Sequence, residues 1–155
     1  MSDKKKIHKP GKKSLIVIGI VIVILGGALV AVNFIKGDKA VEFKQIGENQ
    51  IPQEITSQVI PEYRTLERAL ACVVEDKIYV VVTRGEKPTS GFDLSISKMV
   101  LEDKDGQTNL IVYADFKDPA KKMALSQVLT YPVQVTKTQL SKLPDTIELR
   151  ISYEE

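Results

Sequence analysis

The chain has 155 residues, 43% of them hydrophobic and 27% charged, which is typical of one small globular domain and leaves no room for two. Its one cysteine excludes an intramolecular disulfide, and its one histidine, His8, lies among lysines near the N-terminus. The rest of the chain therefore cannot hold Ser-His-Asp or Cys-His catalysis, or a zinc site of the usual Cys/His kind.

Residues 1–14 form a basic tail in which six lysines outnumber one aspartate. The tail has a net charge of +5, and because the formal net charge of the whole chain is +2, the remainder carries −3. A basic end joined to a mildly acidic body indicates two environments along one chain.

Residues 15–35, LIVIGIVIVILGGALVAVNFI, contain no charged residue. As a helix that rises about 1.5 Å per residue, this segment would cross a hydrocarbon core of roughly 30 Å. We predict an uncleaved transmembrane helix here. The alternative is a cleaved secretory signal, but the apolar core of such a signal is usually only about 7–15 residues long.

The lysines of the tail also predict the orientation of this helix in the cell membrane. The positive-inside rule places residues 1–14 in the cytoplasm and residues 36–155 outside it, because the charges that follow the helix nearly cancel. The lysine run could instead bind nucleic acid or anionic lipid, but topology accounts for it, and we predict no nucleic-acid partner. Gly27 and Ala31 have the spacing of small residues that pair membrane helices, which would allow weak homo-association.

Residues 36–50 are polar without an apolar period and predict a linker, so that residues 51–155 form the extracytoplasmic domain. Pro61-Glu62 predicts the start of a helix that ends near Glu75-Asp76, because proline suits the first turn. The apolar residues that follow at helical spacing are Tyr63, Leu66, Leu70 and Val73. Cys72 would lie on the apolar side of this helix as a small buried hydrophobe.

From residue 77 onward the period of the apolar residues changes to two, which predicts strands. The predicted strands are Lys77–Arg84, apolar on both faces, then 92–97, 110–116, Val128–Lys137 and Thr146–Ser152. Asp105-Gly106 predicts a tight turn, and Asp118-Pro119 ends the third strand. The predicted fold is mainly β, a small β-sandwich or barrel-like sheet of about five strands with one N-terminal helix, after one transmembrane helix.

The connection between the first two predicted strands is the candidate binding loop. It contains Glu86, Lys87, Pro88, Thr89, Ser90, Gly91 and Phe92. Two glycines bracket a proline, so the ends can turn sharply while the middle stays stiff, and a stiff loop loses little entropy when it docks. A tight connection between neighbouring strands is an equally good interpretation of the same residues.

Two segments resemble a known family. Residues 85–96, GEKPTSGFDLSI, resemble the G-x-K-P-T-G-G-Y segment of the PrcB family of protease-complex subunits, and residues 128–133, VLTYPV, resemble its V-x-T-x-P-Y/F strand. With the spacing between them, the resemblance covers roughly residues 77–137. This sequence departs from the pattern in having Ser90 for glycine, Phe92 for tyrosine and Val133 for an aromatic residue.

The resemblance implies a non-catalytic extracytoplasmic domain that associates with or stabilises a protease. The Glu86–Phe92 loop would contact this protein partner, and Tyr131-Pro132 would be a second contact, although Tyr131 could equally pack in the core. Gly91→Trp is then expected to abolish partner capture while leaving the fold largely intact. We predict no catalytic residue, no metal and no cofactor.

Two alternatives remain open, and a third pattern, S-x-x-K, is not favoured. The loop also resembles the N-P-T-T-G-Y loop of chagasin-type inhibitors of cysteine proteases, which implies inhibition. A structural envelope protein without a protease partner would use sheet edges or helix faces instead. Ser95-Ile96-Ser97-Lys98 fits the S-x-x-K pattern of penicillin-recognising enzymes, but on an alternating strand Ser95 and Lys98 are expected to face opposite sides.

Overall fold

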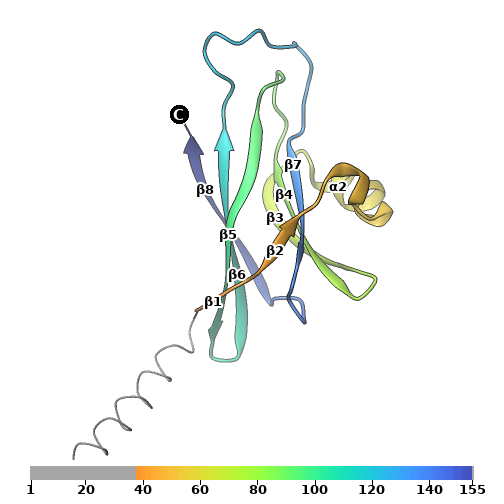
Figure 1. Cartoon of the computed structure of the whole chain (residues 1–155), viewed down its shortest axis with the longest axis vertical. Helices are drawn as coiled ribbons and strands as arrows, with labels where there is room; N and C mark the ends of the chain where they lie inside the picture. Colours follow the sequence, from red (N-terminus) through yellow and green to blue (C-terminus); the bar gives the residue numbers. More distant parts are fainter. Residues whose placement is uncertain (1–37, 155) are drawn as a thin grey trace, which may run out of the picture. The chain divides into compact units, whose positions relative to one another are not determined.

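A computed structural model describes residues 38–154, which belong to one compact unit (Figure 1). The predicted basic tail, residues 1–14, and the predicted transmembrane helix, residues 15–35, lie outside the described residues. Between residues 38 and 154, the structure contains no helix with both the length and the apolar character needed to cross a membrane.

Residues 38–154 contain eight strands, which form two four-stranded sheets. The first sheet has the order β1 (Asp38–Ala40), β5 (Asp93–Lys104), β6 (Gln107–Lys117) and β8 (Thr146–Glu154). The second has the order β2 (Phe43–Gln45), β7 (Val133–Thr138), β4 (Lys77–Arg84) and β3 (Glu67–Val74). Neighbouring strands are antiparallel except β6 and β8, which are parallel. The mainly β prediction is confirmed, and within the described residues the two sheets do not close into a barrel.

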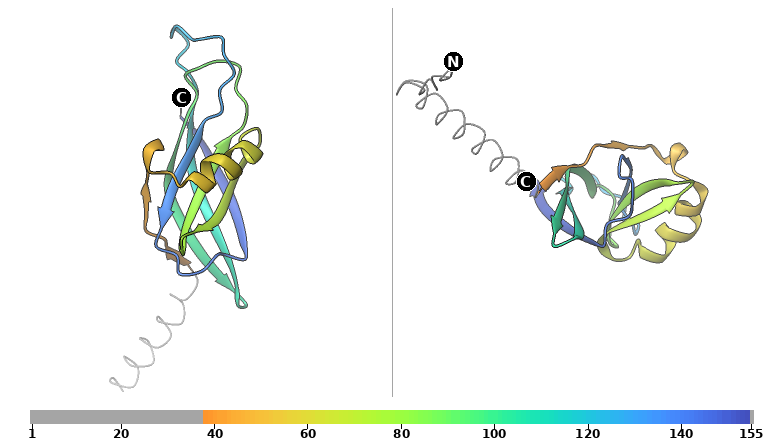
Figure 2. Two further views of the ribbon diagram at one scale, coloured as in Figure 1. Left: turned by 90° about the vertical axis from the view of Figure 1, so that its right-hand side faces the viewer. Right: turned by 90° about the horizontal axis from the view of Figure 1, so that it is seen from below.

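The main core lies between the two sheets, which face each other in Figure 2. β6 carries the predicted apolar face, and its four residues are fully buried: Leu110, Val112, Ala114 and Phe116. β4 fills both of its faces, as predicted: Val80 and Val82 pack toward the first sheet, while Tyr79 and Val81 pack on the other side. A strand that is apolar on both faces is thus explained by its position between two hydrophobic layers.

The layer outside the second sheet is helical. It consists of a 3-10 turn, η1 (Glu48–Gln50), a π-helical turn, η2 (Ile55–Val59), and the short α-helix α2 (Ile60–Tyr63). Ile55 is fully buried here against Tyr79, Val81 and Val135. This apolar contact, rather than helix length, holds the segment on the sheet, because so short a helix is marginal by itself.

The prediction of a helix from Pro61-Glu62 to Glu75-Asp76 is wrong. Helical structure ends at Tyr63, and Glu67–Val74 is the strand β3, which forms a hairpin with β4. Leu70, Cys72 and Val74 pack under the helical layer, while Ala69 and Ala71 face the main core, so the true period is two. Glu75 and Asp76 have φ of 48° and 57°, as a two-residue hairpin turn requires.

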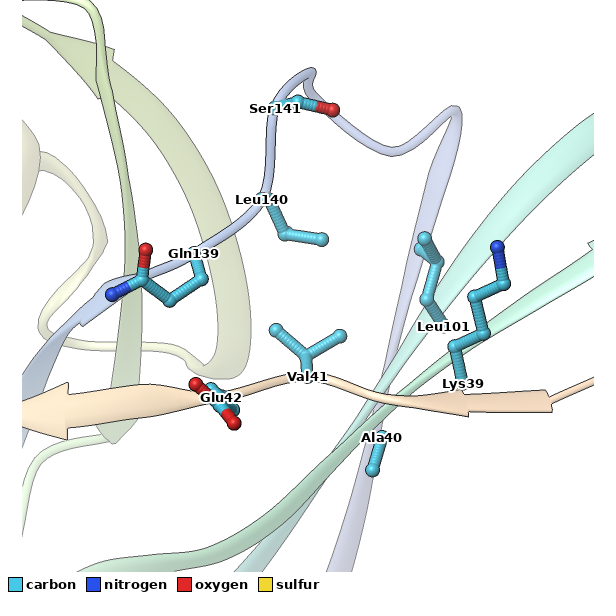
Figure 3. A pocket seen from close by; sticks show the side chains of 8 residues that line it. All are labelled: Lys39, Ala40, Val41, Glu42, Leu101, Gln139, Leu140 and Ser141. Carbon is cyan, nitrogen blue, oxygen red and sulfur yellow. The ribbon is translucent and has the colours of Figure 1, made fainter.

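The prediction of a polar linker over residues 36–50 is corrected in its described part. β1 pairs with Val100–Glu102, and β2 pairs with Thr136–Thr138 in the other sheet. Between them the chain crosses from one sheet to the other, and Figure 3 shows the Val41 side chain directed toward Leu140 at this crossing. A pocket of about 390 Å³ lies there. Strands of three residues are too short to leave a periodic signal, which is why this edge of the fold was missed.

The remaining strands follow the prediction with shifted ends. The turn at Asp105-Gly106 is confirmed, with φ of 55° and 82°, and β6 ends at Lys117, immediately before Asp118-Pro119. β7 begins only at Val133, so residues 128–132 belong to the preceding loop. This difference places the second family-like segment beside the first, at one end of the domain.

Candidate functional site

Two loops lie together at one end of the sandwich (top of Figure 1). We call residues 85–92, between β4 and β5, the motif loop, and residues 118–132, between β6 and β7, the long loop. Lys87 and Thr130 form an isolated antiparallel bridge, in which each N–H donates to the other carbonyl over 2.9 Å. The two segments that resemble the PrcB family are therefore hydrogen-bonded to each other.

The middle of the motif loop also binds the long loop. Ser90 N–H donates to the Ser126 carbonyl over 3.0 Å, and Ser126 N–H donates back to Ser90 Oγ over 2.9 Å. Thr130 Oγ1 donates to the Thr89 carbonyl over 2.8 Å. Ser90 stands where the family pattern has glycine, and its hydroxyl supplies a bond that glycine could not make. The motif loop is thus a support for its neighbour as well as a surface.

Gly91 lies where no other residue fits. Its φ is +90°, and a Cβ atom would come within 2.8 Å of Pro119 Cβ and 2.9 Å of Leu125 Cδ2. A left-handed backbone and this close approach both require glycine. The expectation that Gly91→Trp would leave the fold largely intact is therefore wrong, because that side chain would push the two loops apart.

Arg84 joins the bases of the two loops, and sequence reasoning missed it. Its side chain is 2% exposed, and Nη1 donates to the Asp93 carbonyl over 2.8 Å and to the Lys117 carbonyl over 2.6 Å. Nη2 pairs with the Asp118 carboxylate. The guanidinium also lies 5.1 Å from the centre of the Phe92 ring and 4.9 Å from that of Phe116. The one available signal was a cation close behind the apolar run of residues 78–82 in β4.

Phe92 and Tyr131-Pro132 meet at a groove of about 520 Å³ beside the motif loop. The groove lies between the start of β5, the start of β7 and the helical layer, and its other lining residues are Glu48, Ile51, Thr56, Ile60, Asp93 and Val133. The structure therefore brings Phe92 of the motif loop and Tyr131-Pro132, both predicted from sequence to contact a partner, to the same groove. The lining of the groove mixes polar and apolar side chains, and its charged residues, Glu48 and Asp93, are negative.

Tyr131 is held from two sides. The Arg64 guanidinium lies 4.4 Å from the centre of its ring, and the Tyr131 hydroxyl donates to Glu86 Oε2 over 2.6 Å. This hydrogen bond to the Glu86 carboxylate, with partial burial and the negative charge of Glu86, raises the pKa of Tyr131 above its ordinary value. Tyr131 is thus a half-buried wall of the groove and not a core residue, and its role as a surface anchor for a partner stays a prediction.

The other motif-loop residues divide into exposed and half-buried ones. Glu86 and Pro88 are exposed, whereas Lys87, Thr89 and Phe92 are half-buried. Lys87 Nζ lies 5.8 Å from the centre of the Phe92 ring, so both cations near this ring, Lys87 and Arg84, are close enough for cation–π contact.

The S-x-x-K pattern is arranged differently from the expectation. A β-bulge between Ile96 and Lys98 shifts the register, so that Ser95 pairs with Asp115 and Lys98 with Tyr113. Asp115 and Tyr113 flank the buried Ala114, and Ser95 and Lys98 therefore share the outer face of the sheet instead of lying on opposite faces. Both residues are exposed. In residues 38–154 no three acidic, histidine or cysteine side chains gather as a metal site would require.

Comparisons with known proteins give one match. Residues 78–139 match the family model described as PrcB C-terminal, from the second residue of β4 to the residue after β7. This segment contains the motif loop, the long loop and Arg84. No curated protein and no solved structure matches the chain.

Proposed function

We propose that this protein is a membrane-anchored, non-catalytic subunit whose β domain binds an extracytoplasmic protease or another protein of the protease complex. The observation that carries the proposal is the PrcB C-terminal match over residues 78–139, because this segment includes both hydrogen-bonded loops. The anchor is residues 15–35, and no step of the proposal requires a cofactor.

The position of the loops supports this proposal. Asp38, where the described chain begins, pairs with Glu102, whereas the motif loop leads into Asp93 at the other end of the same strand. Nine residues of strand separate these points by about 30 Å, since each residue rises about 3.4 Å. A domain attached to the membrane through residues 15–35 would therefore carry its loops at the end away from its attachment.

The arrangement of the loops also fits binding better than catalysis. Hydrogen bonds fix the motif loop and the long loop in one conformation, so docking would lose little conformational entropy. The groove beside them is lined in part by the aromatic residues Phe92 and Tyr131, and such residues are enriched in protein interfaces.

The proposal is tested by site-specific photocrosslinking of the full-length protein in its native cells. Pro88→benzoylphenylalanine places the probe on the exposed part of the motif loop, and Gln107→benzoylphenylalanine, beside the Asp105-Gly106 turn at the other end of the sandwich, is the control. Covalent capture of a protease or a protein bound to it at position 88, and not at position 107, is the expected result. Capture of wall or envelope proteins alone would refute the protease partner.

A chagasin-like inhibitor is distinguished by activity. An inhibitor would reduce turnover of a small peptide substrate by the captured protease, whereas a stabilising subunit would prolong the life of that protease without blocking its cleft. We propose the stabilising role, because five hydrogen bonds join the motif loop to the long loop and leave little of the motif loop free to enter a cleft.

A further inference from the structure

The long loop exposes three large apolar side chains, two of which, Val128 and Leu129, were predicted to lie in a strand. Of the seven large hydrophobic residues that are exposed in the described part of the chain, three lie in this loop: Met123 at 55%, Val128 at 55% and Leu129 at 59%. The other four are scattered over different elements. Exposed apolar side chains gathered in one short segment mark an interaction site more often than single ones do.

The same loop is positively charged. Lys121 and Lys122 are exposed, and the structure pairs neither of them with a carboxylate of residues 38–154. The one acidic residue of the loop, Asp118, is paired with the buried Arg84, so its charge is compensated. The tip of the long loop therefore combines three exposed apolar side chains with two lysines that form no ion pair within the described part of the chain.

The motif loop holds this tip in place. Gly91 lies against Pro119, Leu125 and Met123, and Ser90 makes two hydrogen bonds with Ser126. Further along, the bridge between Lys87 and Thr130 closes the loop just after Leu129. The apolar and cationic residues are thus presented from a supported backbone, which lowers the entropic cost of binding.

We infer that Lys121, Lys122, Met123, Val128 and Leu129 form the principal partner contact, and that they bind an apolar patch rimmed by carboxylates on a protein. This inference deepens the proposed function and rests on it for the compartment of the partner. The positive charge of the tip selects an acidic partner, and methionine adapts its shape to an apolar surface. The motif loop acts as the support that positions the contact.

A protein surface suits this tip better than a lipid surface does. The loop contains neither tryptophan nor phenylalanine, two residues that often enter a bilayer interface, and Ser126 and Gln127 interrupt its apolar residues between 123–125 and 128–129. It also lies at the end of the sandwich away from Asp38, where the chain enters the domain.

The test uses the full-length protein in native membranes with a benzoylphenylalanine probe at one of three positions. Leu129 reports on the tip, Pro88 on the motif loop, and Val73, which is 50% exposed on β3, is the matched apolar control. We expect the Leu129 probe to give the highest yield of crosslinked protein. We also expect the crosslinked peptide of the partner to contain aspartate or glutamate beside apolar residues.

Charge reversal makes the second arm of the test. The double substitution Lys121→Glu and Lys122→Glu should lower the crosslinking yield from position 129 about tenfold, because opposite charges steer the encounter. Added salt should lower the yield with the original lysines, and this salt dependence should be absent in the double variant. Lys104→Glu, at the exposed turn of the other end, is the control and should leave the yield unchanged.

The outcomes separate this inference from the proposed function. Capture of the protease complex from position 88 but not from position 129 would leave the function standing and overturn the inference. Capture from position 129 of an acidic protein that belongs to no protease complex would support the inference and overturn the proposed function. Crosslinks from position 129 to lipid only, to a second copy of this chain only, or to nothing would each overturn the inference.

Discussion

Arg84→Met should destabilise the domain at the base of the two loops. Methionine keeps most of the side-chain volume between Phe92 and Phe116, so the change removes the guanidinium without opening a large cavity. The partly buried Asp93 and Lys117 carbonyls would then lose the donor that Arg84 supplies. The variant therefore isolates the polar contribution of Arg84.

The expected loss in the free energy of unfolding of Arg84→Met can be worked out from the hydrogen bonds that it removes. Each bond from a charged donor contributes about 1.5–3 kcal/mol, which gives roughly 3–6 kcal/mol for the two carbonyls. Arg84 is itself costly to bury, and its Nε has no partner among the described residues, so the net loss should be smaller, about 2–4 kcal/mol. Asp118 is 63% exposed, and Asp118→Asn should cost less than about 1 kcal/mol.

Urea denaturation of the full-length chain in detergent, followed by circular dichroism, measures both variants. Hydrogen exchange of the Lys87 and Thr130 amides reports on the loops separately, because their bridge lies just beyond Arg84. We expect a large loss of stability and faster exchange in Arg84→Met only. Equal losses of stability in the two variants would contradict this reasoning. The ion pair with Asp118 would then contribute more to the free energy of unfolding than the hydrogen bonds to the two carbonyls.

Three further outcomes are expected. Gly91→Ala should lower the melting temperature and speed exchange of the loop amides, because its Cβ would meet Pro119; Gly106→Ala, where a Cβ meets nothing within 4 Å, is the control with the same positive φ. Two hydrogen bonds from Thr108 hold the pKa of Asp145 below its ordinary value, so Asp145→Ala should lose stability at neutral pH. In urea denaturation at a series of pH values, the difference from the unsubstituted chain should begin to shrink only below about pH 4 and should continue to shrink as the pH falls through the lowered pKa of the folded state. Glu86→Gln should lower the raised pKa of Tyr131 in a spectrophotometric titration, and no change would place the cause elsewhere.

The sequence predicted those elements whose burial is regular over many residues. β4 and β6 are long, and each keeps an uninterrupted apolar face, so their position in the core could be inferred from periodicity. β3 was mistaken for a helix because Leu66, Leu70 and Val73 happen to have helical spacing, although Leu66 and Val73 are about half exposed, at 49% and 50%. Only the pairing of this segment with β4, a tertiary contact, decides between the two periods.

The candidate site could likewise be predicted from the sequence only in part. The two family-like segments could be recognised in the sequence, but their hydrogen bonding joins residues about forty positions apart, such as Lys87 and Thr130, and no local pattern encodes it. Arg84 was missed for the same reason, since its acceptors lie at the ends of other strands. The bulge beside Ile96, which turns Ser95 and Lys98 to one face, also depends on β6.

The hydrogen bonds between the two loops suggest why residues 85–92 have a recognisable sequence. The motif loop is constrained by the fold, because its residues Lys87, Thr89 and Ser90 hydrogen-bond to the long loop, so its recognisable sequence is explained by the need to build the loop pair. Met123, Val128 and Leu129 make no such bonds with the motif loop, and their exposure, above half in each case, has no counterpart in the packing of the domain. A sequence motif can therefore belong to the loop that supports a binding site, while the residues that determine specificity lie in a neighbouring loop. For this chain, that argument shifts the search for specificity from residues 86–92 to residues 121–129.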